Sequence, residues 1–341
     1  MRDSVEPLPY RAPHADGGRA SQAPPTFSVV IAAHNAAASI QRAVRSVLVQ
    51  TKPPLELIVY DDGSTDATEA VLAPVRDRVT YLRKEHGGVA SARNAAARAA
   101  TGEFFAVLDA DDEYLPERLE ALSELAAARP DLDILCTDAL LELDGNVAGT
   151  FEEGCPFPVE AQAAAILDRC FCVAPAVRRS VLLEVGGYDE SLRTGSDWDC
   201  VIRLIHAGAG AGIVDLPLYR YSIHSGSLTA RRVSTLRDRV TLLSKAGSTL
   251  ELAPPERAAL NHSLARQRGY LALTEAEAAL RAGGPEARRL ALAAARSPGV
   301  GLRSRAAAIA AAIAPRTAAR ELERRALVSG RSRLRRSVRS R

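Results

Sequence analysis

The 341-residue sequence has no apolar run long enough to cross a membrane. The longest run near the C-terminus extends only from Ala306 to Ala314, whereas a membrane-spanning helix needs about 20 apolar residues. The N-terminal segment carries Asp3 and Glu6 and no apolar stretch before Phe27, so it also lacks the charged-then-apolar order of a secretory signal. We therefore expect a cytoplasmic protein that does not span a membrane.

Cysteine is scarce, and its pattern predicts no disulfide framework. The five cysteines are odd in number, scattered and without a Cys-x-x-Cys pair, which indicates a reduced compartment. No Gly-x-Gly-x-x-Gly follows the first predicted strand, which excludes a dinucleotide-dependent dehydrogenase for practical purposes. No lysine occurs between Lys84 and Lys245, which argues against a small receiver-like module with a Mg²⁺ phosphoacceptor pocket.

The net charge of +3 conceals an uneven distribution. Residues 284–341 hold 15 arginines and three glutamates, a charge of +12, so residues 1–283 carry 3 − 12 = −9. The acidic body argues against a nucleic-acid-binding protein. The arginine-rich tail, 331–341, predicts contact with anionic lipid headgroups, with the helix that contains Ile309 and Ile313 lying on the bilayer. The alternative is a solvated, disordered tail.

The order of apolar runs predicts an α/β fold. Residues 1–26 have the composition of a disordered leader. Apolar runs at 28–33, 57–60, 79–82 and 104–108 alternate with segments of helical spacing, which indicates a doubly wound, mainly parallel sheet. Ligands bind at the carboxyl ends of such strands. The polar clusters at those ends are His34-Asn35, Asp61-Asp62 and Asp109 to Asp112.

The second half of the chain is less regular. We predict a helix to about residue 129, a strand at 134–137, a helix at 197–207 and a strand pair near 213–214 and 218–221. From about residue 234 the sequence predicts an all-helical appendage, broken at 254–255, 283–285 and 298. The predicted divisions are a leader (1–26), an α/β domain (27–230), a helical region (231–330) and a basic tail (331–341).

The acidic cluster after the fourth run indicates a metal site. Mg²⁺ and Mn²⁺ prefer oxygen ligands and share them between carboxylates and substrate phosphates. Asp109, Asp111 and Asp112 follow a buried strand, where the backbone is fixed and the side chains can reach a cleft. The alternative for the triplet alone is a solvated acidic turn.

Seven motifs in order, between about residues 27 and 230, resemble the family-two inverting glycosyltransferases with the GT-A fold. Any one of them is a weak signal, whereas seven in the same order are strong. They are VVIAAHN (29–35), ELIVYDDGSTD (56–66), GGVASARN (87–94), DADD (109–112), GGYDE (186–190), SDWD (196–199) and YRYSIH (219–224).

The resemblance implies a nucleotide pocket. The backbone of Ala32 and the ring of His34 would line it, although the family's usual Pro-Thr-Tyr-Asn is kept here only at the asparagine. Asp62 would accept a hydrogen bond from a ring N–H of the base, Arg93 would reach the nucleotide or its phosphates, and Asp109 would contact the ribose. The alternatives are that Arg93 is a surface residue and that the neighbouring acids Asp61 and Asp66 cap the next helix.

The same resemblance implies a metal and a base. Asp111 would bind Mg²⁺ or Mn²⁺, His224 would add a metal or phosphate contact, and Asp112 has no assigned role. Asp197 would be the general base that takes the proton of the acceptor hydroxyl. The competing assignments are Asp199, which would point elsewhere on the helix, and a simple N-cap role for Asp197.

The predicted function is transfer of a sugar from a nucleotide-diphosphate sugar, first of all a UDP-sugar, with inversion. The expected acceptor is a cell-envelope or extracellular glycan or a lipid-linked precursor, with the enzyme at the inner face of the plasma membrane. The altered first motif leaves a second possibility, a degenerate nucleotide-sugar-binding protein without transfer activity.

Overall fold

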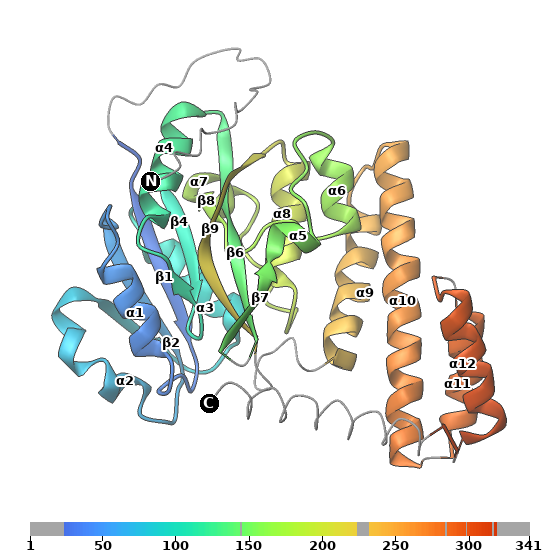
Figure 1. Ribbon diagram of the computed structural model, residues 1–341. Helices are drawn as coiled ribbons and strands as arrows, with labels where there is room; N and C mark the ends of the chain where they lie inside the picture. The colour runs from blue at the N-terminus through green and yellow to red at the C-terminus, as the bar shows by residue number, and fades with distance from the viewer. Residues whose placement is uncertain are drawn as a thin grey trace, which may run out of the picture.

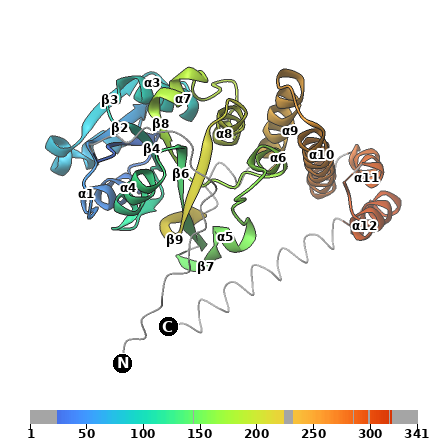
Figure 2. The ribbon, with the colours of Figure 1, turned by 90° about the horizontal axis from the view of Figure 1, so that it is seen from above.

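A nine-stranded sheet with helices on both faces forms the body of the protein, and a helical region stands beside it (Figures 1 and 2). The computed structural model describes residues 24–143, 145–223, 232–283, 285–297, 299–315 and 317–318. Most of the predicted leader and the whole predicted basic tail lie outside these residues, so both stay predictions.

The four predicted apolar runs form the parallel half of the sheet. The strands are β1 (Phe27–Ala33), β2 (Glu56–Asp62), β3 (Thr80–Lys84) and β4 (Phe104–Asp109). Their order is β3-β2-β1-β4, and each pair is parallel. All four carboxyl ends therefore lie at one edge, where the polar clusters were predicted to meet.

Alternate residues of these strands pack into two separate cores. Val29 and Ile31 of β1 face the core that contains Ile40 of helix α1 (Ile40–Leu48). Val30 faces the opposite core, with the alanines of helix α3 (Val89–Ala99). Helices on both faces explain why the runs are apolar throughout rather than alternating. The α/β fold class is confirmed.

The sheet continues beyond β4 with mixed strand directions. The added strands are β5 (Glu113–Tyr114), β6 (Leu132–Leu143), β7 (Asn146–Thr150), β8 (Ala176–Arg178) and β9 (Gly210–Ile223). The predicted strand pair near 213–221 is wrong, because both segments belong to the single strand β9. Its register with β6 shifts between Val214 and Pro217, so Asp215 and Leu216 are accommodated as a bulge without ending the strand.

The remaining helices of the body cover the sheet. In Figure 2, α1 and α4 lie on one side of it, and α3, α7 and α8 lie on the other. Besides α1 and α3, the bounds are Thr68–Val71 for α2, Ala73–Arg78 for a 3-10 turn, Arg118–Ala128 for α4, Phe151–Gly154 for α5, Gln162–Asp168 for α6, Arg179–Glu184 for α7 and Ser196–His206 for α8.

The helical region consists of two layers (Figure 1). Helices α9 (Arg232–Thr249) and α10 (Pro254–Ala282) bury Leu242 and Leu260 in the same core as Trp198 of α8. Helices α11 (Ala287–Arg296) and α12 (Leu302–Ile313) pack outside α10 around a core of small side chains. Among the described helices, none has the length and apolar character of a membrane span.

The loop after α7 is fastened to α3 by one buried amide. Asn94 accepts a hydrogen bond from the Tyr188 backbone N–H at 2.7 Å and donates to the Tyr188 carbonyl at 2.8 Å. Gly187, with φ +71°, lies so close that an added Cβ would be 2.3 Å from the Asn94 Oδ1. Neighbouring Gly186, with φ +82°, has no such contact.

We expect Gly187→Ala to lower the free energy of unfolding by about 1–3 kcal/mol, because it adds a steric clash to a left-handed backbone. Gly186→Ala is the matched control, since it introduces only the backbone strain. Denaturant unfolding of both variants measures the difference. Equal losses would show that the contact with Asn94 contributes nothing.

Candidate active site

The first motif is joined to the second at the carboxyl edge of the sheet. Ala32 lies in register with Asp109 of β4 on one side and with Tyr60 of β2 on the other. Asn35 follows with φ +52°, and its Oδ1 accepts a hydrogen bond from the Thr65 N–H at 2.8 Å. The predicted nucleotide pocket therefore has its strand ends held together by an asparagine side chain.

Asp62 is the buried centre of this pocket. Asp62 is 2% exposed. Its carboxylate accepts hydrogen bonds from the backbone N–H groups of Gly87 at 2.8 Å and Gly88 at 2.7 Å. Lys84 adds a cation at 3.5 Å from Oδ1. These donors offset the burial of an ionised carboxylate and fix its orientation.

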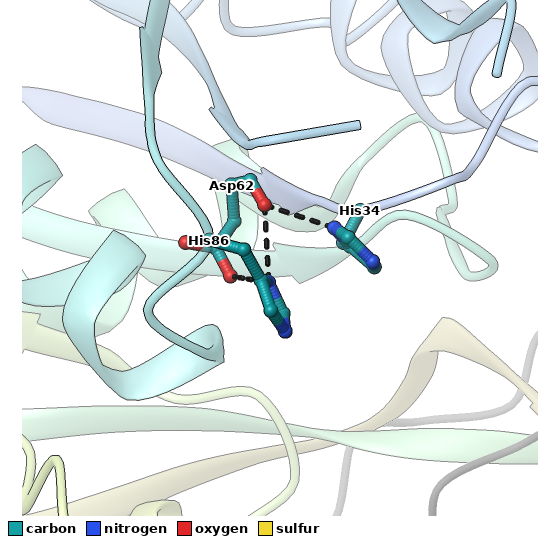
Figure 3. A group of neighbouring side chains, drawn as sticks. All are labelled: His34, Asp62 and His86. Carbon is teal, nitrogen blue, oxygen red and sulfur yellow. Dashed lines mark hydrogen bonds and ion pairs between the residues drawn. The ribbon is translucent and has the colours of Figure 1, made fainter. Parts of the chain in front are cut away.

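Two histidines lie against Asp62 (Figure 3). The Nδ1 atoms of His34 and His86 lie 2.9 and 3.1 Å from the Asp62 carbonyl oxygen, and the two rings are stacked. The three residues offer ligand atoms within 4.8 Å of one another, a set that could hold a metal ion. The sequence prediction missed His86. Its position directly before the Gly87-Gly88 motif is the signal that could have found it.

Arg93 is a buried residue, so the alternative of a surface arginine is wrong. The residue is 7% exposed, and its guanidinium is paired with Asp109 at 2.5 Å and lies 5.5 Å from the Tyr188 ring centre. Burial opposes its charge, but Asp109, Tyr188 and Asp197 together raise its pKa. Arg93 thus links the ends of β4 and α8 electrostatically.

Asp111 and Asp112 differ sharply in environment. Asp111 is partly exposed, and its carbonyl accepts a hydrogen bond from Arg42 at 2.7 Å. Asp112 is 1% exposed and accepts hydrogen bonds from the Tyr219 hydroxyl at 2.6 Å and the Ser222 N–H at 2.7 Å. Asp112 therefore joins the turn formed by residues 109–112, the acidic turn, to β9. The sequence had left the role of Asp112 unassigned.

The electrostatics of the acidic turn favour a cation. Burial and the nearby charges of Asp109 and Asp111 raise the pKa of Asp112 to about 8, although its two hydrogen-bond donors act in the opposite direction. Three carboxyl groups so close together repel one another when ionised. A divalent cation would relieve that repulsion.

Asp197 and Asp199 take different positions in the first turn of α8. Asp197 is exposed, and no hydrogen bond or ion pair to its carboxylate is found among the described residues. Asp199 is buried and paired with Arg203 at 2.8 Å. Arg203 also donates to the carbonyls of Val185 and Gly187, so Asp199 belongs to a structural network and is not available as a base.

The neighbouring acids make local contacts in the turn before α2, whose N-cap residue Ala67 has no side-chain cap. Asp66 accepts from the Thr68 N–H at 2.9 Å, at the start of α2. Asp61 accepts from the Ser64 N–H at 2.7 Å and from the Tyr81 hydroxyl, so it closes the turn before α2. His224 lies outside the described residues, and its metal role stays a prediction.

Comparison with known proteins agrees with this geometry. The sequence model of the family described as "Glycosyl transferase family 2" matches residues 28–147. The domain at residues 28–147 therefore belongs to glycosyl transferase family 2. The matched segment covers β1 to β4 and the acidic turn, and so contains every predicted nucleotide and metal residue except His224.

Curated relatives of this chain are longer than the matched region. The succinoglycan biosynthesis protein ExoO of Rhizobium meliloti is 31% identical over 218 residues, which cover 60% of this chain and 63% of ExoO. Chondroitin synthase of Pasteurella multocida is 31% identical over 188 residues, covering 54% of this chain and 19% of the synthase. The chain thus spans less than two thirds of these relatives.

Two solved structures share the fold. S. aureus TarS 1-349 in complex with UDP-GlcNAc has a TM-score of 0.58 at 17% identity and covers 84% of this chain and 91% of that one. The mannosyltransferase PcManGT from Pyrobaculum calidifontis, in complex with GDP-Man and Mn²⁺, has a TM-score of 0.55 at 21% identity, covering 88% and 84%. They confirm the GT-A type of fold.

Proposed function

We propose that this family 2 protein transfers a sugar from a nucleotide-diphosphate sugar to an acceptor hydroxyl with inversion. The observation that carries the proposal is the position of Arg93, a buried cation paired with Asp109 and close enough to Asp197 for their charges to interact. Arg93, the proposed contact to the sugar donor, and Asp197, the candidate base, are thereby brought together. An exposed carboxylate can take the proton of an acceptor hydroxyl, and the buried cation of Arg93 would stabilise negative charge near the diphosphate leaving group.

The donor would occupy the pocket at the ends of β1, β2 and β4. Asp62 and His34 would hold the base and the backbone of Ala32 would line its site, while Asp109 would contact the ribose. The buried Nε of Arg93 has no hydrogen-bond partner among the described residues, so this N–H could donate to an anionic ligand only after a shift of the side chain. The nucleotide-sugar complexes of TarS and PcManGT support this class of donor, and a UDP-sugar is the first choice.

The metal would bind at the acidic turn. Asp111 supplies a partly exposed carboxylate beside Asp109, an oxygen donor set that suits Mg²⁺ or Mn²⁺. Burial is the main cause of the raised pKa of Asp112, and the negative charges of Asp109 and Asp111 add to it. The bound cation would act as a Lewis acid on the departing diphosphate. The Mn²⁺ in PcManGT supports this choice, and His224 remains the proposed additional contact.

The acceptor would be a glycan or a lipid-linked precursor of the cell envelope. The relatives named for succinoglycan biosynthesis and chondroitin synthesis support a role in polysaccharide biosynthesis. The alternative function, a nucleotide-sugar-binding protein without transfer, would use the same pocket. Substitution of Asp197 distinguishes the two functions, because only sugar transfer needs a general base.

Peripheral attachment to the inner face of the plasma membrane is proposed from α12. Its outward face carries the exposed side chains Leu302, Ile309 and Ile313, which lie on one side of the helix by their spacing. The arginine-rich sequence at 331–341 follows it. An apolar helix face next to a run of cations suits an anionic bilayer surface.

We expect Asp197→Asn to lower kcat by about 10²- to 10⁴-fold, because an amide cannot take up the proton that the hydroxyl group of the acceptor loses. The Kd for the donor should change little. Single-turnover transfer and calorimetric titration measure the two quantities. Asp199→Asn is the matched control and should lower the unfolding temperature instead, since it breaks the pair with Arg203. Retained turnover in Asp197→Asn would contradict the assignment of Asp197 as the general base.

We expect Asp111→Asn to weaken Mn²⁺ binding in the presence of nucleotide by at least about tenfold, since it removes a proposed ligand. Electron paramagnetic resonance of free Mn²⁺ measures this without any turnover. Asp131→Asn serves as control, because Asp131 pairs with Arg129 at the opposite edge of the sheet. Equal Mn²⁺ affinities in the two variants would contradict the assignment.

We expect the double variant Ile309→Asn, Ile313→Asn to lose sedimentation with phosphatidylglycerol vesicles, because it makes the outward face of α12 polar. A chain truncated after Ser329 should lose it as well. Val159→Asn, at another exposed apolar position, is the control. Electrostatic attachment would be contradicted if the wild type also bound neutral phosphatidylcholine vesicles. It would also be contradicted if the truncated chain bound phosphatidylglycerol vesicles as well as the wild type does.

A further inference from the structure

The ring of His86 makes the two contacts that the proposed function reserves for a nucleobase. It stacks on His34, with ring centroids 4.1 Å apart and 27° between the planes. Its Nδ1 lies 2.8 Å from Oδ2 of Asp62. Figure 3 shows the rings of both histidines and the dashed contacts from each of them to Asp62. A small aromatic ring that donates an N–H to a carboxylate and stacks on an imidazole resembles a bound base.

The hydrogen-bond network determines which nitrogens carry protons. The Nδ1 of His86 faces two acceptors, the Oδ2 and the carbonyl oxygen of Asp62, so it must be a donor. The Nδ1 of His34 faces the same carbonyl, and its Nε2 lies 3.2 Å from the amide nitrogen of Asn35. That amide is oriented by the Thr65 N–H donating to its oxygen. Both Nδ1 atoms are thus protonated, which favours hydrogen bonding over metal binding.

With His86 in place, the Oδ2 oxygen of Asp62 has no position left for a base. Each oxygen of an ionised carboxylate accepts about two hydrogen bonds. Oδ1 accepts from Gly87 and lies near Lys84. Oδ2 accepts from Gly88 and from His86. Of the two contacts to Oδ2, the one from His86 can be removed by a side-chain rotation, whereas the one from Gly88 requires a movement of the backbone.

We infer that His86 occupies the nucleobase site of the free protein and that donor binding exchanges its ring for a base with a ring N–H, such as uracil or guanine. This inference rests on the proposed function. The His86 side chain is 61% exposed, and an open pocket of about 520 Å³, lined by Gly63, Arg83 and Lys84 among others, lies beside it. The ring can therefore leave while the Gly87 and Gly88 amides keep Asp62 in place.

The exchange predicts that removing the ring strengthens nucleotide binding. We expect His86→Ala to bind UDP or GDP about three- to tenfold more tightly than the wild type, because no stacking and no hydrogen bond to a carboxylate must be broken first. His34→Ala should bind more weakly, since the base loses its stacking partner. His262→Ala, which removes an exposed imidazole on α10, should match the wild type. Isothermal titration calorimetry with Mn²⁺ measures all four proteins.

A second readout on the wild type does not depend on variant stability. The Hε1 proton signal of His86, assigned by its loss in His86→Ala, should shift when saturating nucleotide displaces the ring. Unchanged or weaker binding by His86→Ala, or an unmoved His86 signal, would overturn the exchange while leaving the nucleotide site intact. Failure of the wild type and of His86→Ala to bind either nucleotide would instead overturn the proposed function itself.

Discussion

The charge of one buried side chain, Arg93, constrains the whole site. A guanidinium this far from water is costly unless anions compensate it, and here Asp109 pairs with it directly while Asp197 contributes at longer range. These acids come from β4 and α8, and Arg93 itself comes from α3. Three elements that are distant in the sequence must therefore assemble correctly for the cation to be tolerated.

A second buried cation supports the acidic turn from behind. Arg118 is fully buried between the rings of Tyr114 and Tyr219, at 4.7 and 4.9 Å. Tyr219 in turn donates to Asp112. The turn that carries Asp109 and Asp111 is thus held by a chain of aromatic and polar contacts that reaches into the core. Such a support would fix the direction of the carboxylates that we propose as metal ligands before any cation arrives.

Local patterns in the sequence were enough for the four parallel strands and for the edge at which the candidate site lies. The apolar runs before His34, Asp61 and Asp109 are continuous and end in polar residues, so their positions and their shared edge could be predicted. The burial of Arg93 could not, because it depends on Tyr188 and α8, nearly a hundred residues later in the sequence. The same holds for Asp112, whose partner Tyr219 lies on β9.

Two further differences have local causes that a pattern does not reveal. The strand β9 continues through Pro217 because its pairing register with β6 shifts on both sides of this residue. The new register is defined by the assembled sheet and not by a local pattern in the sequence. His86 has no apolar or periodic signal at all. Its position follows from the backbone of Gly87 and Gly88, which brings the preceding residue against Asp62.

The shared core of α8, α9 and α10 determines where this protein can be divided. Leu242, Leu243 and Leu260 fill the same interior as Trp198, so a chain ended before α9 would expose the apolar side of the helix that carries Asp197. The glycine at 283, with φ +64°, closes α10, and beyond it α11 and α12 pack around a core to which α10 contributes Ala276 and Leu280. The unit that folds with the site therefore includes α10, and a chimera joined at Gly283 must supply a new apolar cover for Ala276 and Leu280.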